Sequence, residues 1–263
     1  MFIKIENIKY HIEIKGEGNP IICLHGFSED VSTWKLLDLH GYKLILIDLI
    51  GHGKSDKPKE SKYYSLEVML KHLNKLISKL NLKKYSILGY SMGGRCALAY
   101  TLTYPNEINK LILESASYGE EKILNRLKRR KEDLNLAKSI RENGIEWFNE
   151  YWGSLSIFKS QKVLPESIMN DISRRRLANS THALSNTLES TGQGNLLCLK
   201  DEIVKLSMPI LYISGEYDKK YQKIGREFEV LNANVKHIII NRCGHNTHIE
   251  NINGFVKVLN EFL

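Results

Sequence analysis

The chain has 263 residues, of which 42% are hydrophobic and 26% are charged. These proportions are typical of a globular protein and exclude a disordered chain, a fibrous chain and a disulfide-rich miniprotein. Lys and Arg number 38 against 30 Asp and Glu, so the net charge is +8, which could suit nucleic acid, an anionic membrane or an acidic small molecule.

The cysteines and the apolar segments predict where the chain resides. Cys23, Cys96, Cys198 and Cys243 lie far apart and form no Cys-x-x-Cys pair. We therefore expect reduced thiols in a cytoplasmic protein, with neither a disulfide framework nor a metal site. We expect no targeting segment, because residues 1–18 alternate charged and apolar side chains, and the apolar runs are too short to span a bilayer.

Short apolar runs predict strands along most of the chain. Residues 2–5 and 10–14 alternate in polarity and predict a β-hairpin, with Gly16 and Gly18 in the turn that follows. The later runs predict strands that are buried on both faces, as in a parallel sheet. These runs span residues 20–24, 44–47, 85–88, 110–113, 209–213 and 235–240.

Helical periodicity fills the intervals between these runs. Residues 65–80 place their apolar side chains on one stripe, which predicts an amphipathic helix. The alternation of strand and helix favours a doubly wound, mostly parallel α/β sheet. Between residues 118 and 194 the pattern stays helical without a good strand. We therefore expect a helical cap at 118–194, inserted into a core formed by residues 1–117 and 195–263.

The segment Gly89-Tyr90-Ser91-Met92-Gly93 has the pattern Gly-x-Ser-x-Gly and stands between a predicted strand and a helical run. In that setting it predicts a nucleophile elbow, a tight turn that lifts the serine hydroxyl above the sheet. The alternative is a glycine-rich turn whose serine only caps the helix.

A serine nucleophile needs a base, and the base needs an acid that orients it. Asp218 and His245 follow the last two predicted strands, in the chain order Ser, Asp, His that this kind of fold uses. The carboxyl ends of the strands are where α/β sheets gather their sites. We therefore predict that Ser91, Asp218 and His245 are catalytic, with Glu216 and His248 as weaker rivals.

Two backbone amides should form the oxyanion hole that this chemistry requires. The amide of Met92 follows the nucleophile directly. The amide of Phe27 is the second candidate, because Gly26 beside it permits an unusual backbone conformation. We expect His25 to brace this loop and His52 to belong to a turn between a strand and a helix.

These motifs give the chain a resemblance to the α/β-hydrolase family over its full length. The matching segments are 25–27, 48–55, 89–95, 215–218 and 244–246. Within that family the chain is similar to the synthases of 2-succinyl-6-hydroxy-2,4-cyclohexadiene-1-carboxylate (SHCHC) of menaquinone biosynthesis. That similarity rests on Gly-Tyr-Ser-Met-Gly-Gly-Arg, on Lys and Tyr after Gly-Glu-x-Asp, and on Gly-His-Asn-x-His-x-Glu-Asn near the carboxyl end.

The resemblance implies a lyase that eliminates pyruvate from 2-succinyl-5-enolpyruvyl-6-hydroxy-3-cyclohexene-1-carboxylate, a small anion with three carboxylates. The serine would take part in proton abstraction and the oxyanion hole would stabilise an enolate, without a cofactor. The resemblance also implies substrate contacts for Tyr90, Arg95, Arg129, Trp152, Arg176, Lys220 and Tyr221. Neighbouring arginines, Arg130, Arg174 and Arg175, leave the register of the cap match open by one or two residues.

One argument from the residues themselves supports a substrate with several carboxylates. Arg95 stands one helical turn after Ser91, and helix side chains lean toward the amino end, so Arg95 should lean back toward the active site. Its planar guanidinium binds a carboxylate through two parallel hydrogen bonds. The alternative is a structural arginine that pairs with a carboxylate of the core.

The catalytic residues alone leave other activities open. A serine hydrolase of carboxylic esters, thioesters or C–C bonds would use the same three residues, although Arg95 and the basic cap favour the elimination. A ligand-binding protein without activity would not need all three. Nucleic acid is disfavoured as a partner, because the basic residues form no stripe with interleaved aromatic side chains, and we expect no stable membrane insertion.

Overall fold

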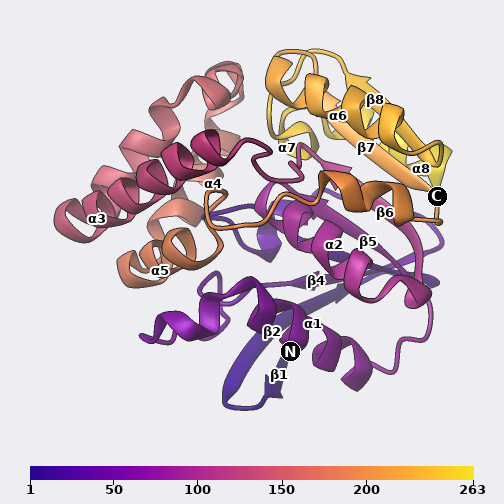
Figure 1. Ribbon diagram of the computed structural model, residues 1–263, viewed down its shortest axis with the longest axis horizontal. Coiled ribbons are helices and arrows are strands. Elements are labelled where there is room, and N and C mark those ends of the chain that lie inside the picture. Colours follow the sequence, from indigo (N-terminus) through magenta and orange to yellow (C-terminus); the bar gives the residue numbers. More distant parts are fainter.

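A computed structural model describes all 263 residues as one eight-stranded sheet with helices around it (Figure 1). The strands are β1 (Phe2–Ile5), β2 (Ile8–Lys15), β3 (Asn19–Leu24), β4 (Tyr42–Ile47), β5 (Tyr85–Tyr90), β6 (Ile108–Glu114), β7 (Ile210–Gly215) and β8 (Val235–Ile240). Their order in the sheet is β1-β2-β4-β3-β5-β6-β7-β8. The pairs β1–β2 and β2–β4 are antiparallel and the other pairs are parallel, which confirms the predicted α/β-hydrolase fold.

Eight helices and five short 3-10 segments complete the chain. The helices are α1 (Leu66–Lys79), α2 (Met92–Thr103), α3 (Ile123–Ser154), α4 (Glu166–Leu177), α5 (Thr181–Thr191), α6 (Lys219–Leu231), α7 (Thr247–Glu250) and α8 (Ile252–Phe262). The 3-10 segments are η1 (Val31–Trp34), η2 (Ser61–Tyr64), η3 (Pro105–Glu107), η4 (Ser156–Val163) and η5 (Lys200–Lys205). No helix combines the length and the apolar character needed to cross a bilayer.

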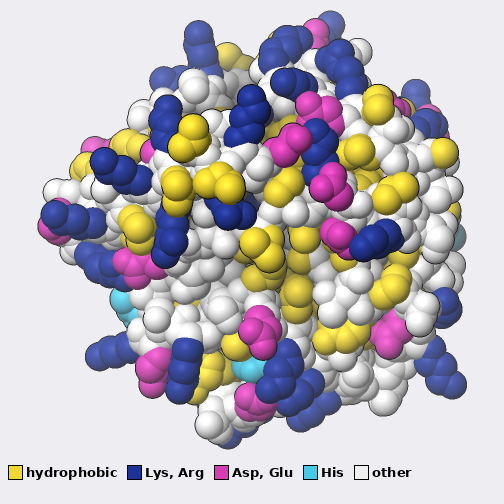
Figure 2. Space-filling model, viewed as in Figure 1, with side chains coloured by type: hydrophobic (Ala, Val, Ile, Leu, Met, Phe, Trp, Pro, Cys, Tyr) yellow, Lys and Arg dark blue, Asp and Glu magenta, His cyan; other side chains and the backbone are white.

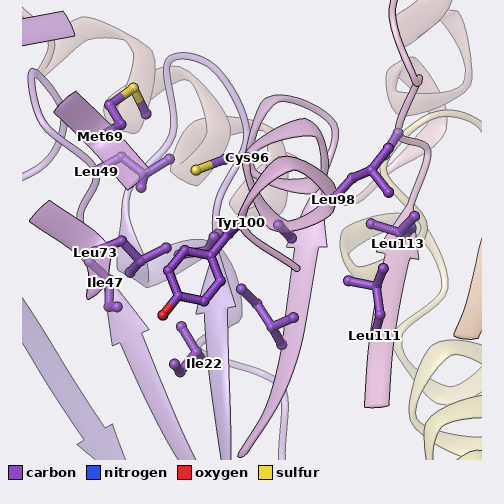
Figure 3. Close-up of a cluster of buried hydrophobic side chains, with 14 of the residues drawn as sticks. Ile22, Ile47, Leu49, Met69, Leu73, Cys96, Leu98, Tyr100, Leu111 and Leu113 are labelled. Carbon is purple, nitrogen blue, oxygen red and sulfur yellow. The ribbon is translucent and has the colours of Figure 1, made fainter. Parts of the chain in front are cut away.

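Each face of the sheet is covered by its own apolar cluster. Successive side chains of a strand point to opposite faces, so Ile22 of β3 joins one cluster while Ile21 and Cys23 join the other. Figure 3 shows part of the first cluster, in which Ile22 lies near Tyr100 of α2, while Leu111 and Leu113 of β6 lie near Leu98. The two apolar clusters hold the sheet rigid, so that the carboxyl ends of the parallel strands, which carry the candidate site, have fixed positions.

One strand departs from the sequence prediction. The run 235–240 was expected to be buried on both faces, but in β8 only the two ends are buried and Ile239 is 39% exposed. The reason is its position, because β8 is the last strand of the sheet and pairs with β7 alone. An edge strand is covered less completely than a central one. The sequence alone does not show the order of the strands, so it does not show which strand lies at the edge.

Between β6 and β7 the chain leaves the sheet and forms a helical cap from α3, η4, α4 and α5 (Figure 1). The cap has a small core of its own, in which Ala137, Ile140 and Phe148 of α3 pack against Leu184 and Leu188 of α5. Its helices lie within residues 123–191, inside the segment 118–194 that was predicted to be a cap.

Candidate active site

The nucleophile elbow forms where β5 turns sharply into α2. Ser91 has φ +49° and ψ −104°, a conformation that costs energy for any residue with a side chain and persists only where the surroundings impose it. A Cβ at Gly93 would lie 2.2 Å from the carbonyl oxygen of Leu24, so only glycine lets α2 start this close to β3. The predicted elbow is therefore present, and it presents the Ser91 hydroxyl at the start of α2.

Ser91, His245 and Asp218 form one hydrogen-bonded chain. His245 Nε2 lies 3.1 Å from Ser91 Oγ, and His245 Nδ1 lies 2.7 Å from Asp218 Oδ2. With its proton on Nδ1, His245 donates to Asp218 and leaves Nε2 free to accept the hydroxyl proton. The other Asp218 oxygen accepts the Tyr221 amide at the start of α6, which fixes the carboxylate. The structure thus assembles the three residues from segments that are far apart in sequence.

The rival acid and base lie elsewhere. Glu216 accepts a hydrogen bond from the Arg242 amide, outside the cavity that contains Ser91. His248 is buried and its Nδ1 lies 2.7 Å from Glu114 Oε2. His25, by contrast, behaves as the expected brace, because its Nε2 accepts the Leu49 amide at 3.0 Å.

Glu114, at the end of β6, ties the elbow to the loop that carries His245. Its backbone carbonyl accepts the Ser91 amide at 2.8 Å. Its carboxylate accepts three further hydrogen bonds, from Thr247 Oγ1 at 2.6 Å, from the His248 amide at 3.0 Å and from the His248 ring. This fully buried side chain was missed in the sequence, where it directly follows the apolar run 110–113.

We expect Glu114→Ala to lower the free energy of unfolding by about 2–3 kcal/mol, because it leaves the donors of Thr247 and His248 buried without an acceptor. Urea denaturation measures the change. Glu261→Ala, which removes an exposed carboxylate from α8, is the matched control and should stay within about 0.5 kcal/mol of the wild type. Equal stability of the two variants would contradict this role for Glu114.

The two predicted oxyanion-hole residues flank the nucleophile. Phe27 and Met92 line the same cavity as Ser91. Neither backbone amide takes part in the hydrogen bonds of the surrounding turns. Met92 is the first residue of α2, so its amide also lies at the positive end of the helix dipole. Both amides are therefore free to donate to a negatively charged oxygen beside Ser91.

A cavity of about 350 Å³ lies between the sheet and the cap, within the range of small-molecule sites. It contains Ser91 and His245 together with every residue predicted to contact the substrate. Those residues are Tyr90, Arg95, Arg129, Trp152, Arg176, Lys220 and Tyr221. Residues from both halves of the core and from the cap thus meet at one place.

The structure shows which of the cap arginines line the cavity. Arg129 lines the cavity, whereas its neighbour Arg130 is exposed to solvent. In α4, Arg174 is exposed and lies 3.4 Å from Asp171, while both Arg175 and Arg176 line the cavity. The sequence singled out Arg176 and did not identify Arg175 as a second inward-facing side chain.

The cationic side chains of the cavity are only partly balanced by acids. Arg95 makes no ion pair, and its Nε is buried without a hydrogen-bond partner, so the alternative of an arginine paired in the core is not what the structure shows. Burial lowers the pKa of Arg95. Arg129 does have a partner, Asp133, at 2.8 Å. Glu29 and Glu132, which were not predicted as site residues, also line the cavity, and Glu29 accepts a hydrogen bond from Asn246.

Aromatic side chains enclose the rest of the cavity. The rings of Tyr90 and Tyr221 lie 5.4 and 4.7 Å from that of His245, and burial raises the pKa of each phenol above its usual value. Both phenols therefore stay protonated and can act as hydrogen-bond donors. Trp152 packs edge-on against Phe27 at 5.3 Å, which places it in the wall of the cavity.

Comparison with known proteins agrees with this architecture. The family model described as the alpha/beta hydrolase fold matches residues 19–252. The chain belongs to the α/β-hydrolase fold family. A Bacillus subtilis protein that is provisionally named a 2-succinyl-6-hydroxy-2,4-cyclohexadiene-1-carboxylate synthase is 34% identical, over 98% of this chain and 96% of its own length.

Solved structures give the same result. MenH from S. aureus superposes with a TM-score of 0.91 at 32% identity, covering 96% of this chain and 97% of its own. An enol-lactonase from Burkholderia xenovorans LB400 shares the fold at 20% identity, with a TM-score of 0.86 over 100% of this chain and 99% of its own. The B. subtilis relative and the MenH structure confirm the resemblance to the SHCHC synthases found in the sequence.

Proposed function

We propose that the protein is a lyase that converts 2-succinyl-5-enolpyruvyl-6-hydroxy-3-cyclohexene-1-carboxylate into SHCHC and pyruvate in menaquinone biosynthesis. The observation that carries the proposal is the presence, in one cavity, of the Ser91–His245–Asp218 chain and of cations without acidic partners. Arg95, Arg176 and Lys220 have no ion pair within the protein. The full-length relative from B. subtilis, through its name, supports the same reaction.

The geometry suits a proton abstraction followed by loss of a leaving group. Ser91 Oγ, as it passes its own proton to His245 Nε2, takes the proton from ring carbon 2 of the substrate, next to the succinyl carbonyl. The electron pair moves onto the carbonyl oxygen, where the amides of Phe27 and Met92 stabilise the enolate. When the enolate collapses, the ring double bond shifts and the C–O bond at ring carbon 5 breaks. His245 returns its proton to the departing enolpyruvate, which becomes pyruvate.

The cations give this site its preference for an anionic substrate. Arg95, Arg129 and Lys220 lie close enough to one another for their charges to interact and would hold carboxylates together, while Arg176 lies on α4. The guanidinium of Arg176 lies 5.3 Å from the ring of Phe158, which keeps it oriented while it has no acidic partner. Tyr90, Tyr221 and Trp152 would position the ring and the succinyl chain.

Two further aspects of the proposal concern the surroundings of the enzyme. We place it in the cytoplasm, because all four cysteines are free thiols and three of them are buried. We propose a small anionic substrate as its partner, without nucleic acid. On the face shown in Figure 2, Lys and Arg are scattered among acidic and apolar side chains and form no continuous stripe.

We expect pyruvate to be released from the enolpyruvyl substrate with a kcat/KM at least about 100-fold above that for p-nitrophenyl acetate. A neutral ester leaves the cations of the cavity unpaired, which costs binding energy. Coupling pyruvate to lactate dehydrogenase measures the first reaction, and nitrophenol absorbance measures the second. Faster ester hydrolysis, without pyruvate release, would instead support the serine hydrolase alternative, whose chemistry uses the same three residues.

A further inference from the structure

The last turn of α4 contains three successive arginines that face different surroundings. Arg174 is exposed and interacts with Asp171, and a cation in the last turn of a helix is also favoured by the helix dipole. Arg176 is the residue that the sequence had matched to the relatives. Arg175, between them, is only 4% exposed and lines the cavity.

Arg175 is a buried cation without a partner. No ion pair and no hydrogen bond involves its guanidinium, and its Nε is buried without an acceptor. Its backbone carbonyl is held by Asn179 Nδ2, at 2.8 Å, and the same amide nitrogen donates to the carbonyl of Ser28 in the loop of the oxyanion hole. The end of α4 is thus fixed over the core by contacts that do not use the arginine side chain.

Burying the charge of Arg175 lowers the stability of the ligand-free protein, and no contact within the protein compensates for it. Removing an ionised group from water is unfavourable by several kcal/mol unless a counter-charge is supplied. A place near the helix carboxyl end does not require burial, because Arg174 lies in the same last turn of α4 and remains exposed. An anion in the cavity is the partner that would compensate Arg175.

We propose that Arg175, together with Arg176, forms a second carboxylate-binding site on the α4 side of the cavity, separate from the one at Arg95 and Arg129. This inference deepens the proposed function, which supplies a substrate with three carboxylates. The two groups of cations come from different elements, α2 and α3 for the first and α4 for the second. Two separate sites would fix the ring in one orientation relative to Ser91, which a single cluster of cations would not.

The first test measures the melting temperature of the ligand-free protein. Arg175→Met removes the buried charge and keeps a long side chain, so we expect the melting temperature to rise by about 2 °C or more. Arg174→Met is the matched control on the same helical turn and should leave it unchanged. A fall for Arg175→Met would show a structural role and would overturn the proposal.

The second test uses tricarballylate, an unreactive tricarboxylate, at constant ionic strength. It should raise the melting temperature of the wild type and of Arg174→Met, and raise that of Arg175→Met clearly less. An equal rise in all three proteins would overturn the site. Because this probe undergoes no reaction, the result stands even if the wild type releases no pyruvate, in which case the proposed function alone fails.

The third test measures steady-state kinetics with the enolpyruvyl substrate. Arg175→Gln should raise KM by about tenfold or more, the factor lost with a charge-assisted hydrogen bond, while kcat changes less than about threefold. Arg175→Lys should recover part of the loss, since it keeps the charge but not the planar fork. An unchanged KM in Arg175→Gln would contradict the proposal.

Discussion

Replacing Ser91 by alanine, His245 by alanine or Asp218 by asparagine should each lower kcat for pyruvate release by about 10³–10⁴-fold. Ser91→Ala removes the atom that lies between the base and the substrate. Asp218→Asn keeps the shape but replaces the acceptor that holds the proton on His245 Nδ1, so that Nε2 no longer faces Ser91 as an acceptor. Single-turnover measurement of pyruvate gives the rates.

Two further measurements show that these variants fold and separate elimination from acyl transfer. Each should keep the melting temperature of the wild type within a few degrees, because the chain of hydrogen bonds is short and lies at the edge of a cavity. Mass spectrometry of the wild type during turnover should find Ser91 unmodified. Near wild-type kcat in any folded variant would remove that residue from the mechanism, and an acyl adduct on Ser91 would replace proton abstraction by nucleophilic attack.

The second large effect is expected at Arg95. Arg95→Ala should reduce kcat/KM by a factor equivalent to about 2–5 kcal/mol of transition-state stabilisation, because a substrate carboxylate is then buried without its partner. Arg95→Lys should restore only part, since an ammonium group lacks the planar fork. In the ligand-free protein Arg95 has no acidic partner to lose, so the melting temperature should not fall.

Arg130→Ala is the control for Arg95, because Arg130 is an exposed arginine near the same cavity. It should leave kcat/KM within about twofold of the wild type. If Arg95→Ala keeps its kcat/KM while its melting temperature drops, Arg95 is structural. Binding of the anionic substrate would then depend on the cap arginines alone.

Most of the fold could be predicted from the sequence because its signals are local. The continuous apolar run of β3 and the stripe of apolar residues in α1 indicate directly which side chains face the core. The order of strands across the sheet is not a local property, and this is why the prediction that β8 is buried on both faces was wrong. The cap could be recognised as helical, but its own core, in which Phe148 meets Leu184, depends on contacts that periodicity does not specify.

The candidate site also contains residues that the sequence predicts and residues that it does not. Ser91 and His245 lie in short motifs that can be recognised in the sequence, because their backbone conformations require particular residues, such as the glycines around the elbow. Arg175 and Glu114 lie in no such motif, since an arginine among arginines and a glutamate at the end of a strand are both common on surfaces. Only burial distinguishes them, and burial is set by how the cap and the loop around His248 pack on the core.

The cap is one continuous insertion in the chain, so changes in the cap can be separated from changes in the catalytic core. The two ends of the cap lie side by side, because Gln193 Nε2 donates to Ser117 Oγ at 3.0 Å and the Leu199 amide donates to the Tyr118 carbonyl at 2.7 Å. Insertions, deletions and substitutions between them can reshape the roof of the cavity while the hydrogen bonds of Ser91, His245 and Asp218 stay intact. Selection for a new ligand can therefore act on one continuous stretch of the gene. Replacing the cap with that of another protein is a practical way to engineer the substrate specificity of this site.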